Sequence, residues 1–546
     1  MDLLKPRSHP SFGRFEAVIL GLYVLLSGWI TYFHEPWADE AQAWLIARDS
    51  SLSDLFLKRL HYEGTPGLWH LLLWVFCRLH ISYTGMHWAT VVIGAAAVYL
   101  LLRYSPFPPL VRAVLPFCFS LVYLTAIVAR SYSLAPVLTF AACAVLTAKR
   151  DRPVLFAVVL GLLGNTASFG FMLALGMAPL YFLRPGCGVA SITTGRRVLA
   201  GSALALLLLF SAYTALPAPD MTFGAGEKLA SHPAIGHLLS EVTGIPQPGL
   251  SKEGSLPLVG KLAPDLDQAF PDLDQAFLAR HANHRFLAHQ ILRFVSIGSP
   301  AFFPVSKSNV LAFLFYAALL WWLFRRRSLP ALLPLLMILL AGHYLGMGEH
   351  HMSLITAALI VALWVGWNRP ASISRRSEII FQVILLAVLV EQVAWTAHAA
   401  AYDIQEPFDG SIATAHFILP KVGKYRIASI GFEPLAVLPY TSHNIYYNQT
   451  TTYWPWKRFL NPDDDLAQVV AGHPDFILDG EARTADTMMA DQIMTQVPRD
   501  WPYDPHDRAG YLREHGYRET HRFCGFQPVQ FSFYRETCDL IYEPIR

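Results

Sequence analysis

Apolar runs recur along most of this chain, and they constrain its fold more than any other feature. They cover residues 14–33, 86–102, 113–129, 133–148, 154–165, 169–183, 198–216, 308–324, 329–346, 352–367 and 379–397. A helix that crosses a bilayer needs roughly 20 mostly apolar residues. The composition agrees, because 54% of the residues are hydrophobic and only 15% are charged, whereas soluble domains carry about 25% charged residues. We therefore predict an α-helical multi-pass membrane protein with about 11 transmembrane helices in the lipid bilayer.

One further apolar run, residues 66–79, is too short to cross a bilayer. As a helix it would rise only about 20 Å, whereas the hydrocarbon core is roughly 30 Å thick. We therefore interpret this run as an interfacial helix in the first outer loop. With the run left out of the count, the basic loops all fall on one side, which the positive-inside rule assigns to the cytoplasm. Their basic residues are Lys5, Arg7, Arg14, Arg103, Arg112, Lys149, Arg150, Arg152, Arg184, Arg196, Arg197, Arg325, Arg326, Arg327, Arg369, Arg375 and Arg376.

This topology places the N-terminus in the cytoplasm and the loops 34–85 and 217–307 on the opposite side. The first apolar run lacks an A-x-A-like cleavage site, which indicates an uncleaved first span. We expect a transmembrane domain over residues 1–398 and an extracytoplasmic α/β domain over residues 399–546. The expected location is a bacterial inner membrane, with the second domain in the periplasm.

The polar C-terminal part shows the pattern of a small α/β domain. Residues 425–431, 474–480 and 529–536 have the composition of strands. Cys524 and Cys538 are the two cysteines of this part, and an extracytoplasmic location predicts a disulfide between them.

Two other features narrow the classes of partner. The long outer loop repeats "PDLDQAF" in tandem at 264–270 and 271–277, and two copies are too few for a solenoid, so we interpret them as a duplicated loop segment. The formal net charge is only +2, and no Lys/Arg cluster is interleaved with aromatic residues. The sequence therefore argues against a nucleic-acid partner.

Polar residues gather at the outer ends of the predicted spans. They are Asp39, Glu40, His61, Glu63, Arg130, Tyr132, Asn165, His343, Glu349, His350 and His351. Charged groups at membrane depth are costly unless they are paired or functional. Their location on one side predicts a site at that face of the membrane.

Each of these residues also has a structural interpretation. Asp39 and Glu40 suit the first turn of a helix, where carboxylates interact favourably with the helix dipole. His61 and Glu63 suit a solvated loop before a turn, and Arg130 suits an interfacial anchor. The "GEHH" segment at 348–351 has residue types that bind metals, but adjacent histidines on a helix point about 100° apart. We therefore expect one of these two histidines to be functional and the other to pack.

Three stretches together resemble a known superfamily. They are "WADEAQAW" at 37–44, "YEGTPGLWHLLLWVF" at 62–76 and "AIVARSYSLAPVLTFAACAVL" at 126–146. This organisation resembles the GT-C superfamily of polyprenyl-phosphate-dependent glycosyltransferases, most of all its protein O-mannosyltransferase and aminoarabinose-transferase branch. The resemblance covers roughly residues 10 to 400.

The resemblance implies a transferase that moves a sugar from a polyprenyl-phosphate donor to an extracytoplasmic glycan, lipid or protein, usually with inversion. It implies that Asp39 is the catalytic base and that Glu40 supports it. Glu63 to Pro66 matches the superfamily's His/Glu-x-Pro-Pro segment, but with a single proline. Arg130 and Tyr132 match a frequent "aR-x-Y" motif. The stretch 348–364 matches a late segment that often carries Arg-His, and here Glu349 precedes His350.

The predicted roles follow from these matches. The predicted catalytic residues are Asp39 and Glu40, and a divalent cation, Mg or Mn, is expected on Glu40 and Glu349. The predicted substrate-binding residues are His61, Glu63, Arg130, Tyr132, His350 and His351. Arg130, His350 or the cation would stabilise the leaving phosphate.

Two other functions compete with the transferase. A transporter or flippase of a lipid-linked saccharide predicts ionisable residues near the bilayer midplane and pseudo-repeated halves, whereas here the ionisable residues lie at one rim. A membrane-anchored protein that binds an envelope partner through its C-terminal domain would need far fewer spans.

Overall fold

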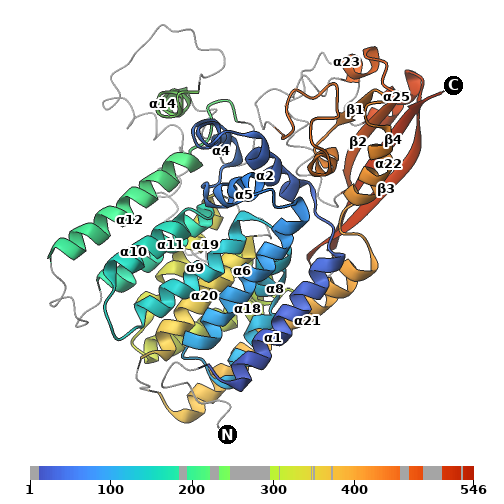
Figure 1. Cartoon of the computed structure of the whole chain (residues 1–546). Helices are drawn as coiled ribbons and strands as arrows, with labels where there is room; N and C mark the ends of the chain where they lie inside the picture. The colour runs from blue at the N-terminus through green and yellow to red at the C-terminus, as the bar shows by residue number, and fades with distance from the viewer. Residues whose placement is uncertain are drawn as a thin grey trace, which may run out of the picture.

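The computed structural model describes residues 12–183, 194–221, 233–245, 295–306, 308–345, 347, 351–369, 373–454, 466–483, 507–530 and 533–545. The N-terminal part is a bundle of apolar helices, and the C-terminal part is a small domain with a four-stranded sheet beside one end of the bundle (Figure 1). A helical fold with a small α/β domain is what the sequence predicts. The tandem repeat at 264–277, Glu349 and His350 lie outside the described residues.

Four of the described helices are long and apolar enough to cross a membrane. They are α1 (Arg14–Phe33), α6 (Tyr83–Tyr104), the Val198–Ala215 part of α12 (Thr194–Ala215), and α21 (Arg375–Gln405). A bent pair of helices adds a fifth if it is counted as one span. Shorter helices form from the remaining apolar runs: α9 (Leu134–Leu146), α10 (Pro153–Gly164), α11 (Ser168–Phe182), α18 (Asn309–Arg325), α19 (Leu333–Leu345) and α20 (Met352–Trp367). The architecture is that of a helical membrane protein.

The bent pair corresponds to the apolar run predicted at 113–129. It consists of α7 (Pro109–Val114), η3 (Leu115–Phe117), α8 (Phe119–Val122) and the π-helical η4 (Tyr123–Ile127). The two halves bend by 61°. Pro116 lies in η3 and donates no backbone hydrogen bond, and Cys118 has an extended backbone (φ −68°, ψ 150°). The run therefore does not form one straight helix.

Burial differs strongly between helices of the bundle. Almost every residue of α20 is buried, which is typical of a helix at the centre of a helical protein. α12 is only 17% buried over its apolar window and exposes Leu206, Leu209 and Phe210. We infer that α20 forms the centre of the bundle and that α12 presents an apolar face to its surroundings.

Buried ion pairs lie at the end of the bundle where α1 and α21 begin. Glu16, in the first turn of α1, pairs with Arg112. Glu378, in the first turn of α21, accepts hydrogen bonds from Arg326 (2.7 Å) and from the indole of Trp367 (2.6 Å). Arg112 and Arg326 are therefore not solvated loop residues. Their carboxylate partners offset the cost of burying them.

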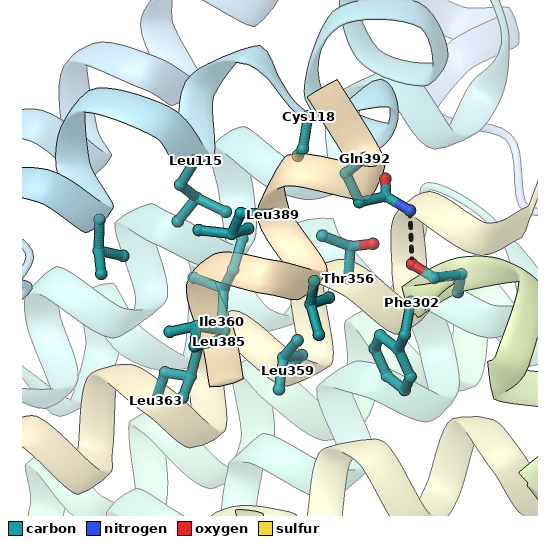
Figure 2. Close-up of a pocket in the computed structure, with 13 residues that line it drawn as sticks. Leu115, Cys118, Phe302, Thr356, Leu359, Ile360, Leu363, Leu385, Leu389 and Gln392 are labelled. Carbon is teal, nitrogen blue, oxygen red and sulfur yellow. Dashed lines mark hydrogen bonds between the residues drawn. The ribbon is translucent and has the colours of Figure 1, made fainter. Parts of the chain in front are cut away.

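A small cavity lies inside the bundle between η3, α20 and α21 (Figure 2). Its volume is about 20 Å³, and most of its lining is apolar, including Leu115, Ile360 and Leu385. A volume of this size holds little more than one water molecule. It is a packing defect of the core and too small for a substrate.

Short helices lie across the end of the bundle where α1 terminates (Figure 1). They are α2 (Ala38–Asp49), α3 (Leu52–Asp54), η2 (Leu55–Arg59), α4 (Leu60–Glu63) and α5 (Leu68–Arg78). α5 forms from the run that the sequence assigns to the interface, and it packs against α2. Gly64 ends α4 with a positive φ of 61°, a conformation that favours glycine. The turn sends the chain from α4 into α5.

The C-terminal domain is a mixed sheet with helices and loops. Its strands are β1 (Ile427–Ile430), β2 (Phe476–Arg483), β3 (Tyr517–Gln530) and β4 (Phe533–Pro544), in the order β1-β2-β4-β3. β1 and β2 are parallel, and the other pairs are antiparallel. The described helical segments are α22 (Ser411–Ile418), η8 (Leu419–Lys421), η9 (Glu433–Tyr440), α23 (Leu466–Ala471) and α25 (Arg508–Glu514). In the helical part, α14 (Pro233–Thr243) belongs to the long outer loop.

The strand predictions for this domain have mixed outcomes. β1 and β2 confirm the strands at 425–431 and 474–480. The strand predicted at 529–536 is confirmed only in part, because its residues belong to two strands: β3 ends at Gln530 and β4 begins at Phe533, and these two residues pair with each other. The sequence there has no Gly, Asn or Pro to mark a turn. The Cys524–Cys538 disulfide is confirmed as a cross-strand bond between β3 and β4.

Candidate functional site

The two adjacent carboxylates at the start of α2 have different environments. Glu40 is completely buried. Its Oε2 accepts the Trp37 backbone N–H at 3.1 Å, and its Oε1 accepts the Ala129 backbone N–H at 2.5 Å. His87 of α6 lies 3.2 Å from the same Oε1. Glu40 therefore caps α2 and binds it to α6 and to the segment after η4.

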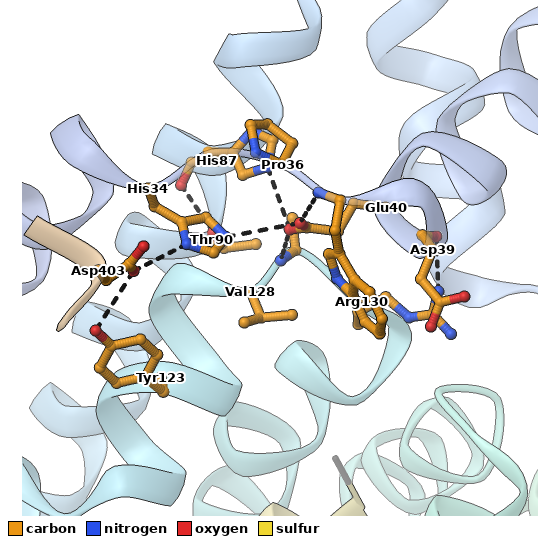
Figure 3. A network of polar contacts seen from close by, with 12 residues as sticks. His34, Pro36, Asp39, Glu40, His87, Thr90, Tyr123, Val128, Arg130 and Asp403 are labelled. Carbon is orange, nitrogen blue, oxygen red and sulfur yellow. Dashed lines mark hydrogen bonds and ion pairs between the residues drawn. The ribbon is translucent and has the colours of Figure 1, made fainter. Parts of the chain in front are cut away.

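A second buried carboxylate extends this network. His34 lies between Glu40 and Asp403, with its Nδ1 3.0 Å from Asp403 and its Nε2 3.6 Å from Glu40 (Figure 3). Tyr123 also donates to Asp403, at 3.4 Å. The network joins the end of α1, the start of α2, α6, η4 and the last turns of α21. We call His34, Glu40, His87, Tyr123 and Asp403 the buried polar network.

Electrostatic attraction between histidines and carboxylates stabilises this network. Burial alone would lower the pKa of His34, but the carboxylates of Asp403 and Glu40 outweigh it and raise that pKa to about 10. Burial would raise the pKa of Glu40, but His87 and His34 outweigh it and keep that pKa well below the usual range. His34 is therefore an imidazolium between two carboxylates at neutral pH. With every Glu40 oxygen engaged and no exposed surface, this arrangement leaves no open face for the divalent cation predicted there.

Asp39 points away from the network and toward Arg130 (Figure 3). The Arg130 guanidinium donates to the Asp39 carbonyl oxygen at 2.6 Å, and its Nη1 lies 3.2 Å from the Asp39 carboxylate. The two side chains are 25% and 21% exposed. Asp39 is thus the member of the acidic pair that a substrate can reach. Its carboxylate forms an ion pair with the Arg130 guanidinium.

Glu63, the third carboxylate of this region, lies at the end of α4. Gln42 of α2 donates to Glu63 Oε1 at 2.8 Å. Burial raises the pKa of Glu63 to about 7, with Asp39 adding to the rise, while Gln42 and Arg130 act against it. Asp39, Glu63 and Arg130 therefore lie within electrostatic reach of one another, and Glu63 is the carboxylate that exchanges a proton near neutral pH.

Tyr132, from the same segment as Arg130, and His351, from another segment, also belong to this group. Tyr132 lies in η5 (Ser131–Ser133) and is buried. Its ring centroid is 6.3 Å from that of His351, the residue before α20, and the His351 ring also packs on Phe169 at 4.7 Å. The structure thus brings together Asp39, Glu63, Arg130, Tyr132 and His351, which we call the rim cluster.

Other predicted residues have structural partners elsewhere. His61 is buried, donates from Nδ1 to the Leu216 carbonyl oxygen (2.8 Å) and packs on Tyr213, so it joins α4 to the end of α12. The Asn165 amide donates to Gly161 and Leu207, which joins α10 to α12. These contacts favour the structural interpretation of both residues.

Another acidic residue, Glu391 in α21, accepts the backbone N–H and hydroxyl of Ser306 at 3.1 and 3.2 Å. Glu349 and His350 lie outside the described residues. Their predicted metal-binding and substrate-binding roles therefore stay predictions.

The sequence analysis missed several residues of this region. His34 and His87 lie at the outer ends of predicted spans, and Asp403 follows the last predicted span. The search for polar residues at outer ends of spans, which found Asp39 and Arg130, therefore also applies to these three residues. Gln42 carries no charge and gave no such signal. Its role depends on a contact with the distant residue Trp454.

The C-terminal domain also contacts α2. Gln42 and the Trp454 backbone exchange two hydrogen bonds, of 2.9 and 2.8 Å, and Arg48 donates to the carbonyl oxygens of Leu438 and Thr441. The domain therefore forms one wall beside the helix that carries Asp39.

A wider cavity lies on the other side of the buried polar network. Its volume is about 470 Å³, and it opens between the ends of α1 and α21 and strand β3. Glu35, Asp403 and Asp409 are among its lining residues. Burial raises the pKa of Glu35 to about 7, which Asp403 increases and His34 reduces. The cavity borders the network at Asp403, whereas Asp39 lies at the other end of the network and points toward Arg130.

Metal-ligand geometry occurs at one place among the described residues, where Cys524, Glu536 and Cys538 come together. Both cysteines are in the disulfide, so this group is not a metal site.

Comparisons of the chain with family models, with curated proteins and with solved structures found no match.

Proposed function

We propose that the protein is a glycosyltransferase that moves a sugar from a polyprenyl-phosphate donor to an acceptor outside the cytoplasm, with inversion. One observation carries the proposal: Asp39, Glu63, Arg130, Tyr132 and His351 come from four separate segments and meet at one end of an apolar helix bundle. An acidic group and an arginine at a membrane rim suit a reaction whose donor has a lipid tail and a phosphate head.

The chemistry assigns a role to each charged group. An acceptor hydroxyl gives its proton to Asp39 while its oxygen attacks the anomeric carbon of the sugar. The bond from that carbon to the phosphate oxygen breaks, and the leaving polyprenyl phosphate takes the electron pair. Arg130 stabilises the added negative charge, because its guanidinium donates to phosphate oxygens in a fixed geometry.

The contact between Asp39 and Arg130 suggests how donor binding prepares the base. Arg130 binds the Asp39 carboxylate (3.2 Å). A donor phosphate would compete for the same guanidinium and leave the Asp39 carboxylate open to the acceptor hydroxyl. Glu63 is the alternative base, because its pKa is already near 7.

We also propose the full topology: about 11 transmembrane helices, a cytoplasmic N-terminus and a periplasmic C-terminal domain in a bacterial inner membrane. A reporter fused after residue 400 should be active only outside the cytoplasm. Activity only in the cytoplasm would contradict this topology.

Radiolabelled sugar transfer from a polyprenyl-phosphate donor, measured with the purified protein in detergent, tests the function. Asp39→Asn should transfer about 10²–10⁴-fold more slowly than the parent protein. Asp54→Asn is the matched control, since Asp54 also pairs with an arginine, Arg59 (2.7 Å), with similar exposure but outside the rim cluster. If Asp39→Asn keeps full activity and Glu63→Gln loses it, Glu63 is the base. No transfer by the parent protein from any polyprenyl-phosphate sugar would contradict the proposed function.

A further inference from the structure

His70 has an unusual environment for a buried histidine. It lies near the start of α5, is 2% exposed, and neither of its ring nitrogens has a hydrogen-bond partner among the described residues. The other buried histidines, His34, His61 and His87, each have one nitrogen engaged. Within the described parts of the chain, His70 is the only buried histidine without a partner at either nitrogen.

Such an arrangement is costly for folding. A buried donor or acceptor without a partner loses its hydrogen bonds to water and gains none in the protein. Phenylalanine or leucine would fill a similar space without this cost. An unsatisfied buried polar group calls for an explanation beyond packing.

The position of His70 supplies a candidate explanation. α5 packs against α2 and against η5, the 3₁₀ turn that follows Arg130. Burial and then the charge of Arg130 lower the pKa of His70 to about 3. The imidazole is therefore neutral, with one N–H donor and one acceptor nitrogen, beside the rim cluster.

The charge beside His70 limits the kind of ligand. A guanidinium repels a metal cation and attracts an anion. No group of metal-ligating residues in the described chain includes His70. An anion with oxygen acceptors, bound to Arg130, would accept the N–H of His70.

We propose that His70 is a binding residue for the phosphate group of the donor and donates a hydrogen bond to it beside Arg130. This inference rests on the proposed function, since it takes the phosphate ester of that donor as the ligand. The phosphate would then have two protein contacts: the guanidinium of Arg130 and a hydrogen bond from His70 on α5.

Binding and stability should respond to His70→Phe in different ways. Affinity for a short prenyl phosphate such as farnesyl phosphate, measured in detergent, should fall at least about ten-fold, as expected for a lost hydrogen bond to a charged group. The melting temperature should stay the same or rise, because an unsatisfied polar group is removed. His70→Leu is the second variant, in case the phenylalanine ring does not fit.

Thr139→Val is the matched control. The Thr139 hydroxyl is also buried without a partner, but it lies on α9, and valine has nearly the same shape. This variant should keep its affinity for prenyl phosphate. Inorganic phosphate is the second probe, and competition that weakens in His70→Phe would support recognition of the phosphate itself.

Three outcomes would overturn the inference. Unchanged prenyl-phosphate affinity in both His70 variants, with Arg130→Ala impaired, would overturn the role of His70 and leave the proposed function standing. A melting temperature that falls in both variants together with the affinity would assign His70 a structural role. Absence of prenyl-phosphate binding by the parent protein would overturn the proposed function and this inference together.

Discussion

Substitution of the two adjacent carboxylates, one at a time, should give opposite results. Glu40→Gln keeps the size of the side chain but removes its charge and gives it an N–H₂ group. Both Glu40 oxygens accept backbone N–H groups, from Trp37 and Ala129. In either orientation of the amide, its N–H₂ group would face one of these donors. The variant also leaves His34 with one carboxylate partner instead of two.

The expected cost can be taken from these contacts. Removal of one partner from a buried ion pair typically costs about 3–5 kcal/mol of unfolding free energy, because a buried charge is left uncompensated. Asp39→Asn removes a partly exposed ion pair, and such pairs contribute about 0–1 kcal/mol. Asp39 does not cap α2, because Glu40 does. Its substitution should therefore have little effect on folding.

Thermal unfolding followed by tryptophan fluorescence, together with the sugar-transfer assay, would test this contrast. Glu40→Gln should unfold at a clearly lower temperature than the parent protein. Asp39→Asn should unfold like the parent protein and like Asp54→Asn, but transfer sugar about 10²–10⁴-fold more slowly. If Glu40→Gln is as stable as the parent protein, the buried polar network does not stabilise the fold.

Two further predictions concern the rim cluster. Arg130→Ala should weaken binding of prenyl phosphate more than Arg130→Lys does, because lysine keeps the charge but not the two-pronged geometry, and equal affinity of all three proteins would reject the phosphate role. The pKa of Glu63 is raised to about 7, so its protonation favours the folded state at low pH, and this contribution is lost as the pH rises through 7. The melting temperature of the parent protein should therefore fall relative to that of Glu63→Gln between about pH 5 and 8, and parallel curves would contradict the raised pKa.

The sequence could predict the general location of the rim cluster. Charged and polar residues at the ends of apolar runs are visible without a structure, because their cost in a membrane makes them rare. That rule selected Asp39, Glu63, Arg130, Tyr132 and His351, which the structure brings together. The disulfide was predictable for a similar reason, since only Cys524 and Cys538 lie outside the apolar part.

The sequence could not show which member of the acidic pair is buried. Adjacent residues on a helix point about 100° apart, so one of them had to face the bundle. The choice depends on contacts of α2 with His87 of α6 and with the backbone of Ala129. His70 was missed for the same reason, because its lack of partners is a property of the packed structure.

Gln42 connects the C-terminal domain with the rim cluster. The same Nε2 group of Gln42 donates to Glu63 and to the Trp454 carbonyl oxygen. Its bond to Glu63 favours the charged carboxylate and so lowers the pKa of that group. Loss of this hydrogen bond would therefore favour the protonated form of Glu63.

Gln42→Leu removes this hydrogen bond to Glu63. The pKa of Glu63 should rise further, because burial and Asp39 then act with less opposition. The fall in melting temperature begins where Glu63 deprotonates in the unfolded chain, which the variant does not change, so the pH at which the fall ends should shift upward relative to the parent protein. The double variant Gln42→Leu with Glu63→Gln should lose the shift. The double variant is needed because Gln42→Leu also breaks the bonds to Trp454, which changes stability at every pH. A Gln42→Leu curve displaced equally at all pH values would show that Gln42 only anchors the C-terminal domain and does not control the protonation of Glu63.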